Sequence, residues 1–171
     1  MQNHFELFQL PMRFDIDQAA LSAAYREVQN QVHPDKFVSA GSAEQRVAMQ
    51  WATRANEAYQ VLKDPLKRAA YLCELHGAAL NVESNTAMPR AFLMQQMEWR
   101  EALQDARASA DLAALEGLDA QLQAERSQLL ALIAQLLDAA QFTEAASQIR
   151  CLMFIQRFGD EVAQAFDVLD A

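Results

Sequence analysis

The sequence is poor in the residues that interrupt helices and in those that build reactive sites. Its 171 residues include four Gly, four Pro, two Cys and three His. Few Gly and Pro leave long stretches uninterrupted, and runs of Val, Ile or Thr with the two-residue period of a strand are almost absent. Ala, Leu, Gln and Glu, which favour helices, dominate instead. The sequence therefore predicts an all-α protein.

Cysteine and histidine are too sparse for a metal centre. Cys73 and Cys151 lie far apart in the chain and form no Cys-x-x-Cys pair. This usage fits a reducing compartment and favours two semi-buried thiols over a disulfide framework or a zinc site. The three His residues are scattered, and there is no glycine-rich phosphate loop. We expect no enzymatic activity, no catalytic residues, no bound metal and no cofactor.

Long apolar runs are also missing. The longest, residues 129–137, contains Gln135 and is too short to span a bilayer. The first ten residues include Glu6 and lack a positive segment followed by an apolar one, so we expect no signal peptide. Apolar residues make up 52% of the chain and charged residues 22%, as in a globular protein. These features predict a cytoplasmic protein with no membrane contact.

Positive charge is scarce and unevenly placed. The net charge of −9 argues against nucleic acid as the main partner. Residues 1–76 carry eight Lys or Arg and nine Asp or Glu, whereas residues 77–171 carry six Arg, no Lys and fourteen acids. This change predicts two units: an N-terminal domain over 1–76, a linker over 77–86 and a C-terminal domain over 87–171.

The N-terminal unit has the pattern of four helices. A short apolar helix ends at Pro11, and Asp17 is placed to cap a second helix. The dipeptide Asp64-Pro65 suits the start of a short fourth helix, which Gly77 is placed to end. The second and third helices, joined by a short loop, should form an antiparallel hairpin, with the two short helices beside it.

The third helix has both a start signal and an apolar stripe. Ser42 and Gln45 have the spacing of a capping box. The predicted stripe recurs every three or four residues: Ala48, Trp51, Ala55, Tyr59 and Leu62.

The hairpin places the tripeptide His33-Pro34-Asp35 at its exposed tip. Proline fixes the exit of the chain from the helix and holds an imidazole and a carboxylate on either side. A rigid polar turn of this kind suits recognition by a partner, because catalysis would need a third group and an enclosed pocket. The alternative is that Pro34 only ends the helix and His33 is an ordinary surface residue.

Three long helices are predicted after the linker. Met88-Pro89 can open the first, the second follows Asp111, and the third runs from about Phe142 to Leu169. The second carries an apolar seam of near-heptad spacing: Leu115, Leu118, Leu122, Leu129, Ile133 and Leu136. Short connections predict an antiparallel three-helix bundle.

The first of these helices has two apolar faces. At 100° per residue, one face carries side chains suited to the bundle core: Phe92, Trp99, Leu103 and Ala106. Another carries Leu93, Met94 and Met97, flanked by Glu98 and Glu101. Either this second face belongs to a wide core stripe, or it is exposed to bind a partner. Phe154 poses the same question, because it lies off the main apolar face of the last helix.

Residues 3–76 resemble a J-domain, the module by which J-proteins stimulate the ATPase of DnaK-type chaperones. The resemblance rests on motifs in matching order and spacing: Tyr25-Arg26, His33-Pro34-Asp35-Lys36-Phe37, Asn56-Glu57-Ala58-Tyr59, Leu62, Asp64-Pro65, Arg68 and Tyr71. It implies that five residues engage the chaperone: Arg26, His33, Pro34, Asp35 and Lys36. Many J-domains are rich in Lys and Arg where this chain has Gln29-Asn30-Gln31, which predicts weaker electrostatic steering.

The stretch 91–101 is similar to the signature helix of the HscB family of J-proteins, and the likeness spans essentially the whole chain. In that family the C-terminal bundle binds the iron–sulfur scaffold IscU, and the J-domain presents IscU to the chaperone HscA. The resemblance implies a scaffold-binding face made of six residues: Leu93, Met94, Met97, Glu98, Glu101 and Phe154. Mitochondrial relatives carry an additional N-terminal Cys-x-x-Cys segment, so we expect a protein of the bacterial type.

Together these features predict a monomeric co-chaperone. It is expected to bind IscU, deliver it to the DnaK-type chaperone HscA, and stimulate ATP hydrolysis by HscA during iron–sulfur cluster assembly. Two alternatives stay open: a J-protein adaptor for a different client, and a purely structural helical adaptor with an inactive J-like domain.

Overall fold

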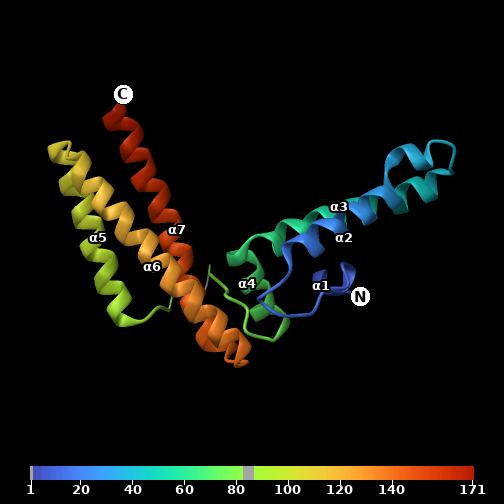
Figure 1. Cartoon of the computed structure of the whole chain (residues 1–171), viewed down its shortest axis with the longest axis horizontal. Coiled ribbons are helices and arrows are strands. Elements are labelled where there is room, and N and C mark those ends of the chain that lie inside the picture. The colour runs from blue at the N-terminus through green and yellow to red at the C-terminus, as the bar shows by residue number, and fades with distance from the viewer. Residues whose placement is uncertain (1, 83–86) are drawn as a thin grey trace. The chain divides into compact units, whose positions relative to one another are not determined.

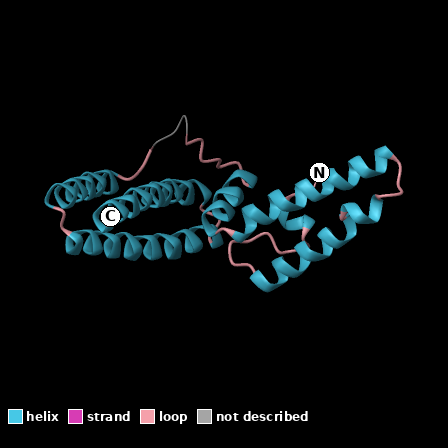
Figure 2. Ribbon diagram, turned by 90° about the horizontal axis from the view of Figure 1, so that it is seen from above, coloured by secondary structure: helices cyan, strands magenta, loops and turns pink. Residues whose placement is uncertain are grey.

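The computed structural model describes residues 2–82 and 87–171, so residues 83–86 of the predicted linker lie outside the described residues. Within these ranges every regular element is a helix, which confirms the predicted all-α class (Figures 1 and 2). The chain divides into two compact units, residues 1–72 and 73–171. This division falls inside α4 (Pro65–Leu75). The functional limits of 1–76 and 87–171 stay a prediction.

The first unit is a helical hairpin with short helices beside it. It contains α1 (His4–Leu7), α2 (Gln18–Val32), the 3-10 helix η1 (Pro34–Phe37), α3 (Ser42–Lys63) and the beginning of α4. Helices α2 and α3 pack antiparallel, as Figure 1 shows, and α1 packs on α3. Asp17 caps α2 as predicted, because its Oδ1 accepts the backbone N–H groups of Ala19 and Ala20.

Small side chains let the two long helices of the hairpin approach each other. The α3 residues that are fully buried or nearly so are Ala48, Ala55, Ala58 and Leu62. The stack of Tyr25 on Tyr59, with ring centroids 4.2 Å apart, extends this contact toward the surface. Trp51 was predicted on the buried stripe but is 38% exposed. Its ring lies beside the guanidinium of Arg54 instead, 5.3 Å away.

A buried guanidinium ties α4 to the rest of the first unit. Arg68 donates from Nε to the carbonyl of Phe14 and from Nη1 to the carbonyl of Leu62, both at 2.7 Å. Burial lowers the pKa of Arg68, and the nearby carboxylates of Asp64 and Asp15 oppose that shift. These bonds fix the end of α3, and hence the hairpin, against the loop before α2.

The second unit is the predicted antiparallel three-helix bundle. It consists of α5 (Arg90–Ser109), α6 (Leu112–Asp138) and α7 (Phe142–Asp170), and α7 packs against both other helices. The buried positions of α6 follow the predicted seam except at its end, where Leu137 is buried in place of Leu136. Two-residue and three-residue connections join the helices, each with one alanine at positive φ: Ala110 and Ala140.

A second buried arginine fixes the approach of the chain to α5. Arg150 of α7 is 8% exposed and donates to the carbonyls of Leu80 and Ala87, at 3.1 and 3.4 Å. Both ends of the segment that precedes α5 are therefore bonded to one side chain of α7. Because Ala87 lies three residues before the start of α5, Arg150 helps to set where that helix begins on the bundle.

Candidate functional site

The tripeptide at the hairpin tip is a turn held by its own hydrogen bonds. His33 ends α2 with φ −58° and ψ 134°, the extended backbone that a following proline requires. The backbone N–H of Asp35 donates to Nδ1 of His33 at 3.2 Å, and the N–H of Lys36 donates to the His33 carbonyl at 3.0 Å. His33 therefore caps η1, and Pro34 occupies its first position.

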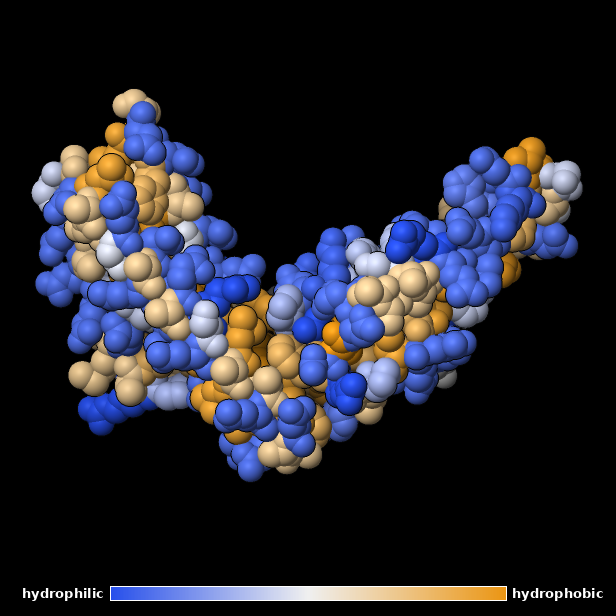
Figure 3. All heavy atoms as spheres, viewed as in Figure 1, coloured by the Kyte–Doolittle hydropathy of each residue, from blue (hydrophilic) through white to orange (hydrophobic). Residues whose placement is uncertain are grey.

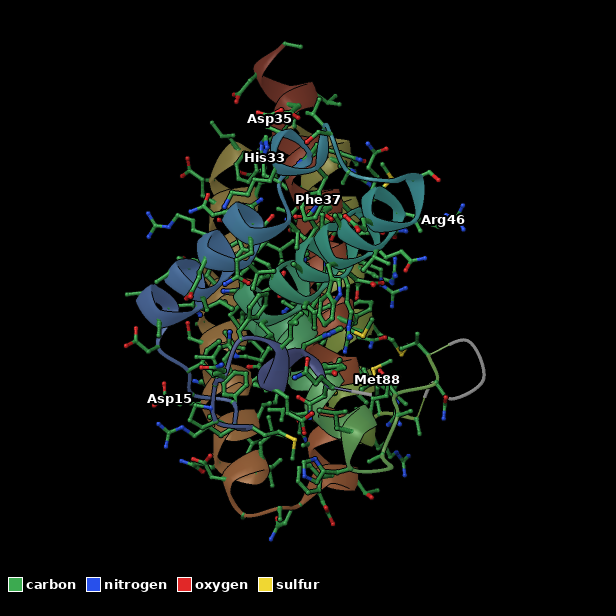
Figure 4. All side chains as sticks on the ribbon, turned by 90° about the vertical axis from the view of Figure 1, so that its right-hand side faces the viewer. Asp15, His33, Asp35, Phe37, Arg46 and Met88 are labelled. Atoms are coloured by element: carbon green, nitrogen blue, oxygen red, sulfur yellow. The ribbon has the colours of Figure 1, made fainter. Side chains whose placement is uncertain are left out.

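This capping bond fixes which nitrogen of the imidazole carries the proton. Nδ1 accepts a hydrogen bond, so the neutral ring is protonated at Nε2, which is left as a donor toward a partner. Oδ2 of Asp35 lies 3.5 Å from Nδ1, next to the ring (Figure 4). The side chains of His33 and Asp35 are 56% and 87% exposed. The turn thus presents a donor and a carboxylate together in water.

Gln45 of α3 anchors the chain that follows the tripeptide. Its Nε2 donates to the carbonyls of Phe37 and Ala40, at 2.9 and 3.3 Å. The predicted capping box of Ser42 and Gln45 is therefore wrong: Gly41 is the N-cap of α3, and no side chain caps it. The Gln45 amide is used to hold η1, a helix that the sequence pattern did not predict.

Four of the five predicted chaperone-binding residues lie in or beside this turn. Pro34 and Lys36 are exposed with His33 and Asp35, and all four follow one another in the chain. Arg26 lies two turns earlier on α2, is exposed, and donates from Nε to the carbonyl of Ser22 at 3.4 Å. The structure therefore groups the tripeptide with Lys36 and leaves Arg26 farther along the same helix.

Two hollows flank the tripeptide. An apolar one of about 380 Å³ lies between η1 and α3 and is lined by residues that include Val32, Pro34, Phe37, Val38, Ala48 and Met49. Figure 3 shows apolar atoms at the surface of this end of the hairpin. The second, of about 320 Å³, has amide side chains in its lining: Gln29, Asn30 and Asn56. Neither hollow has Lys or Arg in its lining, and His33 lines the second. Sequence reasoning missed the apolar hollow because it did not predict η1.

The second candidate surface is on α5. Its predicted core face is confirmed, because Phe92, Trp99, Leu103 and Ala106 are buried. The other apolar face is not part of the core: Leu93, Met94 and Met97 are 43%, 59% and 72% exposed. We call these three residues the α5 patch. Spacings of three and four residues place them on adjacent turns of one side of the helix.

Acidic and amide side chains border the α5 patch. Glu98 follows Met94 by one helical turn, and Glu101 follows Met97 by one turn, and both are exposed. The amide of Gln95 donates to Oε2 of Glu98 at 3.3 Å. The patch thus has an apolar centre with two carboxylates at one end and the exposed guanidinium of Arg90 at the other, which is suited to a partner that combines apolar and charged side chains.

Phe154 does not lie at the surface with the α5 patch. It is 7% exposed and packs edge-on against Phe92, with ring centroids 5.8 Å apart, and stacks with Phe158 at 5.7 Å. The guanidinium of Arg100 covers its ring at 5.4 Å. The helical-angle argument assumed one buried face for α7, but a helix with two neighbours buries a wider arc. The structure answers the question that the sequence left open by placing Phe154 in the core beneath Arg100.

Neither thiol contributes to a surface site. Cys73 and Cys151 are buried, and burial raises the pKa of each to about 11. In the described part of the chain, His, Cys, Asp and Glu nowhere form a group of three or more that could hold a metal ion. No helix among the described residues has the length and apolarity to cross a membrane.

Comparison with known proteins assigns a family model to each unit. A model described as "DnaJ domain" matches residues 3–71, and one described as "HSCB C-terminal oligomerisation domain" matches residues 88–163. The chain is 54% identical to the Co-chaperone protein HscB homolog of Burkholderia multivorans, over 98% of this chain and 96% of that protein.

Two solved structures share the fold along almost the whole chain. Chaperone HscB from Vibrio cholerae is 40% identical with a TM-score of 0.85, over 98% of this chain and 99% of the other. Human co-chaperone protein HscB is 26% identical with a TM-score of 0.88, over 96% of this chain and 82% of the other.

The burial of Phe154 predicts a loss of stability on truncation. Phe154→Ala should lower the free energy of unfolding by about 3–5 kcal/mol, because it removes a ring from a packed aromatic cluster. Met97→Ala, which truncates a 72% exposed side chain, should change it by less than about 1 kcal/mol. Urea unfolding followed by far-UV circular dichroism measures both variants. Equal stabilities would contradict a core position for Phe154.

Proposed function

The chain belongs to the HscB family of J-domain co-chaperones, and on this premise we propose that it binds the iron–sulfur scaffold protein IscU. In this proposal it then delivers IscU to the DnaK-type chaperone HscA and stimulates ATP hydrolysis by HscA. Iron–sulfur clusters are cargo of the scaffold, and no chemistry on iron or sulfur is assigned to this chain. It works as a monomer in the cytoplasm and has no enzymatic activity of its own.

The observation that carries the proposal is that one chain has two exposed surfaces of different chemistry. The turn at the hairpin tip is polar and fixed by hydrogen bonds, whereas the α5 patch is apolar and made of flexible side chains. Each belongs to a different compact unit. Two separate surfaces suit an adaptor that holds one partner while it engages another.

The tip suits docking on the chaperone. Because the Asp35 N–H donates a hydrogen bond to His33 Nδ1, the turn is already ordered and loses little conformational freedom when a partner covers it. The Nε2–H of His33 and the Asp35 carboxylate then bond to HscA, and Lys36 and Arg26 add positive charge nearby. The amide side chains of the adjacent hollow replace the basic side chains common in J-domains, so shape and neutral hydrogen bonds carry more of the recognition.

The α5 patch suits docking of the scaffold. Three large apolar side chains at 43–72% exposure are costly to keep in water and gain free energy when covered. Leu and Met side chains adapt to the shape of a partner. Glu98 and Glu101 favour a partner with basic residues beside its apolar ones. Phe154 supports this surface from beneath, through its contact with Phe92.

Replacement of His33 by Gln tests the role of the tip. His33→Gln removes the imidazole that caps η1 and the Nε2–H donor, so steady-state stimulation of HscA ATPase activity should fall close to the basal rate. The affinity for IscU, measured by isothermal titration calorimetry, should stay within about twofold of wild type, because the α5 patch is untouched. Wild-type stimulation by the variant would contradict the J-domain mechanism.

Truncation of the α5 patch tests the scaffold surface. The double change Leu93→Ala and Met97→Ala should weaken IscU binding by roughly tenfold to a hundredfold, because two apolar contacts of about 0.7–1.4 kcal/mol each are lost. The matched control is Leu112→Ala at the start of α6, since Leu112 is 42% exposed against 43% for Leu93. The control should bind IscU like wild type. Equal losses of affinity in the two variants would contradict a role of the α5 patch in IscU binding. Binding of a different client protein, with no binding of IscU, would favour the alternative of an adaptor for that client.

A further inference from the structure

Two of the three side chains in the α5 patch are thioethers. Met94 and Met97 are 59% and 72% exposed and lie three residues apart on α5, on the same side of the helix. A thioether is apolar and adaptable in its reduced form. Oxidation to the sulfoxide makes the same side chain polar and disrupts methionine-rich interfaces. The chemistry of this surface therefore depends on the oxidation state of two sulfur atoms.

The two thiols of the chain are buried and shielded from an oxidant in water, whereas the two thioethers of the α5 patch are exposed. Cys73 and Cys151 are 0% and 1% exposed, and Cys73 Sγ is hydrogen-bonded to the carbonyl of Phe142 at 3.6 Å. Burial holds the pKa of both thiols well above neutral, so the thiolate that reacts with peroxide is scarce. A mild oxidant in water therefore meets exposed methionine before it meets cysteine.

We propose that Met94 and Met97 form a reversible oxidation site, and that conversion to the sulfoxide by a hydroperoxide weakens the docking of a partner on the α5 patch. The proposal rests on the proposed function, in which that partner is IscU. The site would make delivery of the scaffold sensitive to peroxide through the α5 patch.

The chemistry is a two-electron oxidation at sulfur. A lone pair of the thioether attacks one oxygen of hydrogen peroxide, an S–O bond forms, and the O–O bond breaks. The other oxygen leaves as water after proton transfer. Methionine sulfoxide reductases reverse the change, with the sulfoxide oxygen released as water while two thiols are oxidised to a disulfide.

A sulfoxide oxygen is a hydrogen-bond acceptor, and the exposed guanidinium of Arg90 is a donor one turn before Met94 but two turns before Met97. The flanking carboxylates of Glu98 and Glu101 are acceptors as well. The nearby amide of Gln95 already donates to Glu98. One turn after Met97, the guanidinium of Arg100 lies over the Phe154 ring and pairs with Glu161. A sulfoxide at Met97 covered by an apolar partner surface would therefore lose its hydrogen bonds to water with little replacement. We expect IscU binding to weaken at least tenfold when both sulfurs are oxidised.

The chain provides its own matched control. Met49 on α3 is 69% exposed, close to the value for Met97, but it lines the apolar hollow at the hairpin tip. Oxidation of Met49 should leave IscU affinity unchanged. The comparison separates an effect of oxidation on the α5 patch from a general effect of methionine sulfoxide on the protein.

The test treats the whole chain with a limited dose of hydrogen peroxide. Peptide mass spectrometry locates the sulfoxides, and calorimetry gives the affinity for IscU. We expect sulfoxide at Met94 and Met97 with unmodified Cys73 and Cys151, at least tenfold weaker binding, and recovery after methionine sulfoxide reductases. The variant Met94→Leu with Met97→Leu should bind IscU within about threefold of wild type and keep that affinity after peroxide. Met49→Leu should stay as sensitive as wild type.

Three results would overturn the proposal. One is unchanged affinity of wild type that carries both sulfoxides, and another is an equal loss in the double leucine variant after peroxide. The third is the absence of sulfoxide at Met94 and Met97 at a dose of peroxide that oxidises Met49. Failure of the proposed function has a different signature, because untreated wild type would then not bind IscU. In that case the mapping of sulfoxides alone decides whether the oxidation site exists.

Discussion

A helix in a three-helix bundle has only two neighbours, and this limit determines what α5 presents to water. Contact with α6 and α7 covers the side of α5 that carries Phe92, Trp99 and Leu103. Apolar side chains on the opposite side have nothing to pack against, so the α5 patch stays exposed despite its composition. A hairpin has the same limit at its tip, where α2 has ended and the turn is held by Asp35 N–H, His33 Nδ1 and the Gln45 amide. Both candidate surfaces exist because the small number of neighbours leaves part of each unit uncovered.

The two surfaces differ in how a partner would meet them. The tip is preorganised, since its backbone and the His33 imidazole are fixed before binding, and specificity comes from the placement of a few polar groups. The α5 patch is adaptable, and covering it contributes apolar free energy with little demand on geometry. Arg100 and Phe154 form the ordered boundary of the adaptable α5 patch. The guanidinium covers the ring and pairs with Glu161, so the core continues to the edge of the patch.

Helical periodicity and capping chemistry were enough to predict most of the fold. The Asp17 and Asp64 caps, the start of a helix after Asp111, the hairpin and the bundle all follow from local patterns, and the structure confirms them. The pattern failed at two places on α3, where a side chain makes a contact that periodicity and capping do not describe. Gln45 donates to the carbonyl of Phe37 in η1, and Ser42 forms no capping box. Trp51 lies at the surface beside the guanidinium of Arg54. Periodicity identified the core face of α5 but could not tell whether the second apolar face is buried as well, because that depends on the number of neighbouring helices. Phe154 is buried for the same reason, because α7 has two neighbouring helices and buries a wider arc of its surface.

The account depends on both surfaces acting from one molecule, and a mixing experiment tests this most directly. HscA ATPase activity is measured at fixed IscU with wild type, or with an equimolar mixture of His33→Gln and the double variant Leu93→Ala with Met97→Ala. Each variant in the mixture keeps one intact surface. The account predicts that the mixture falls well short of the stimulation by wild type, because no single molecule joins scaffold to chaperone. Full stimulation by the mixture would show that the two surfaces act independently and would contradict the adaptor mechanism.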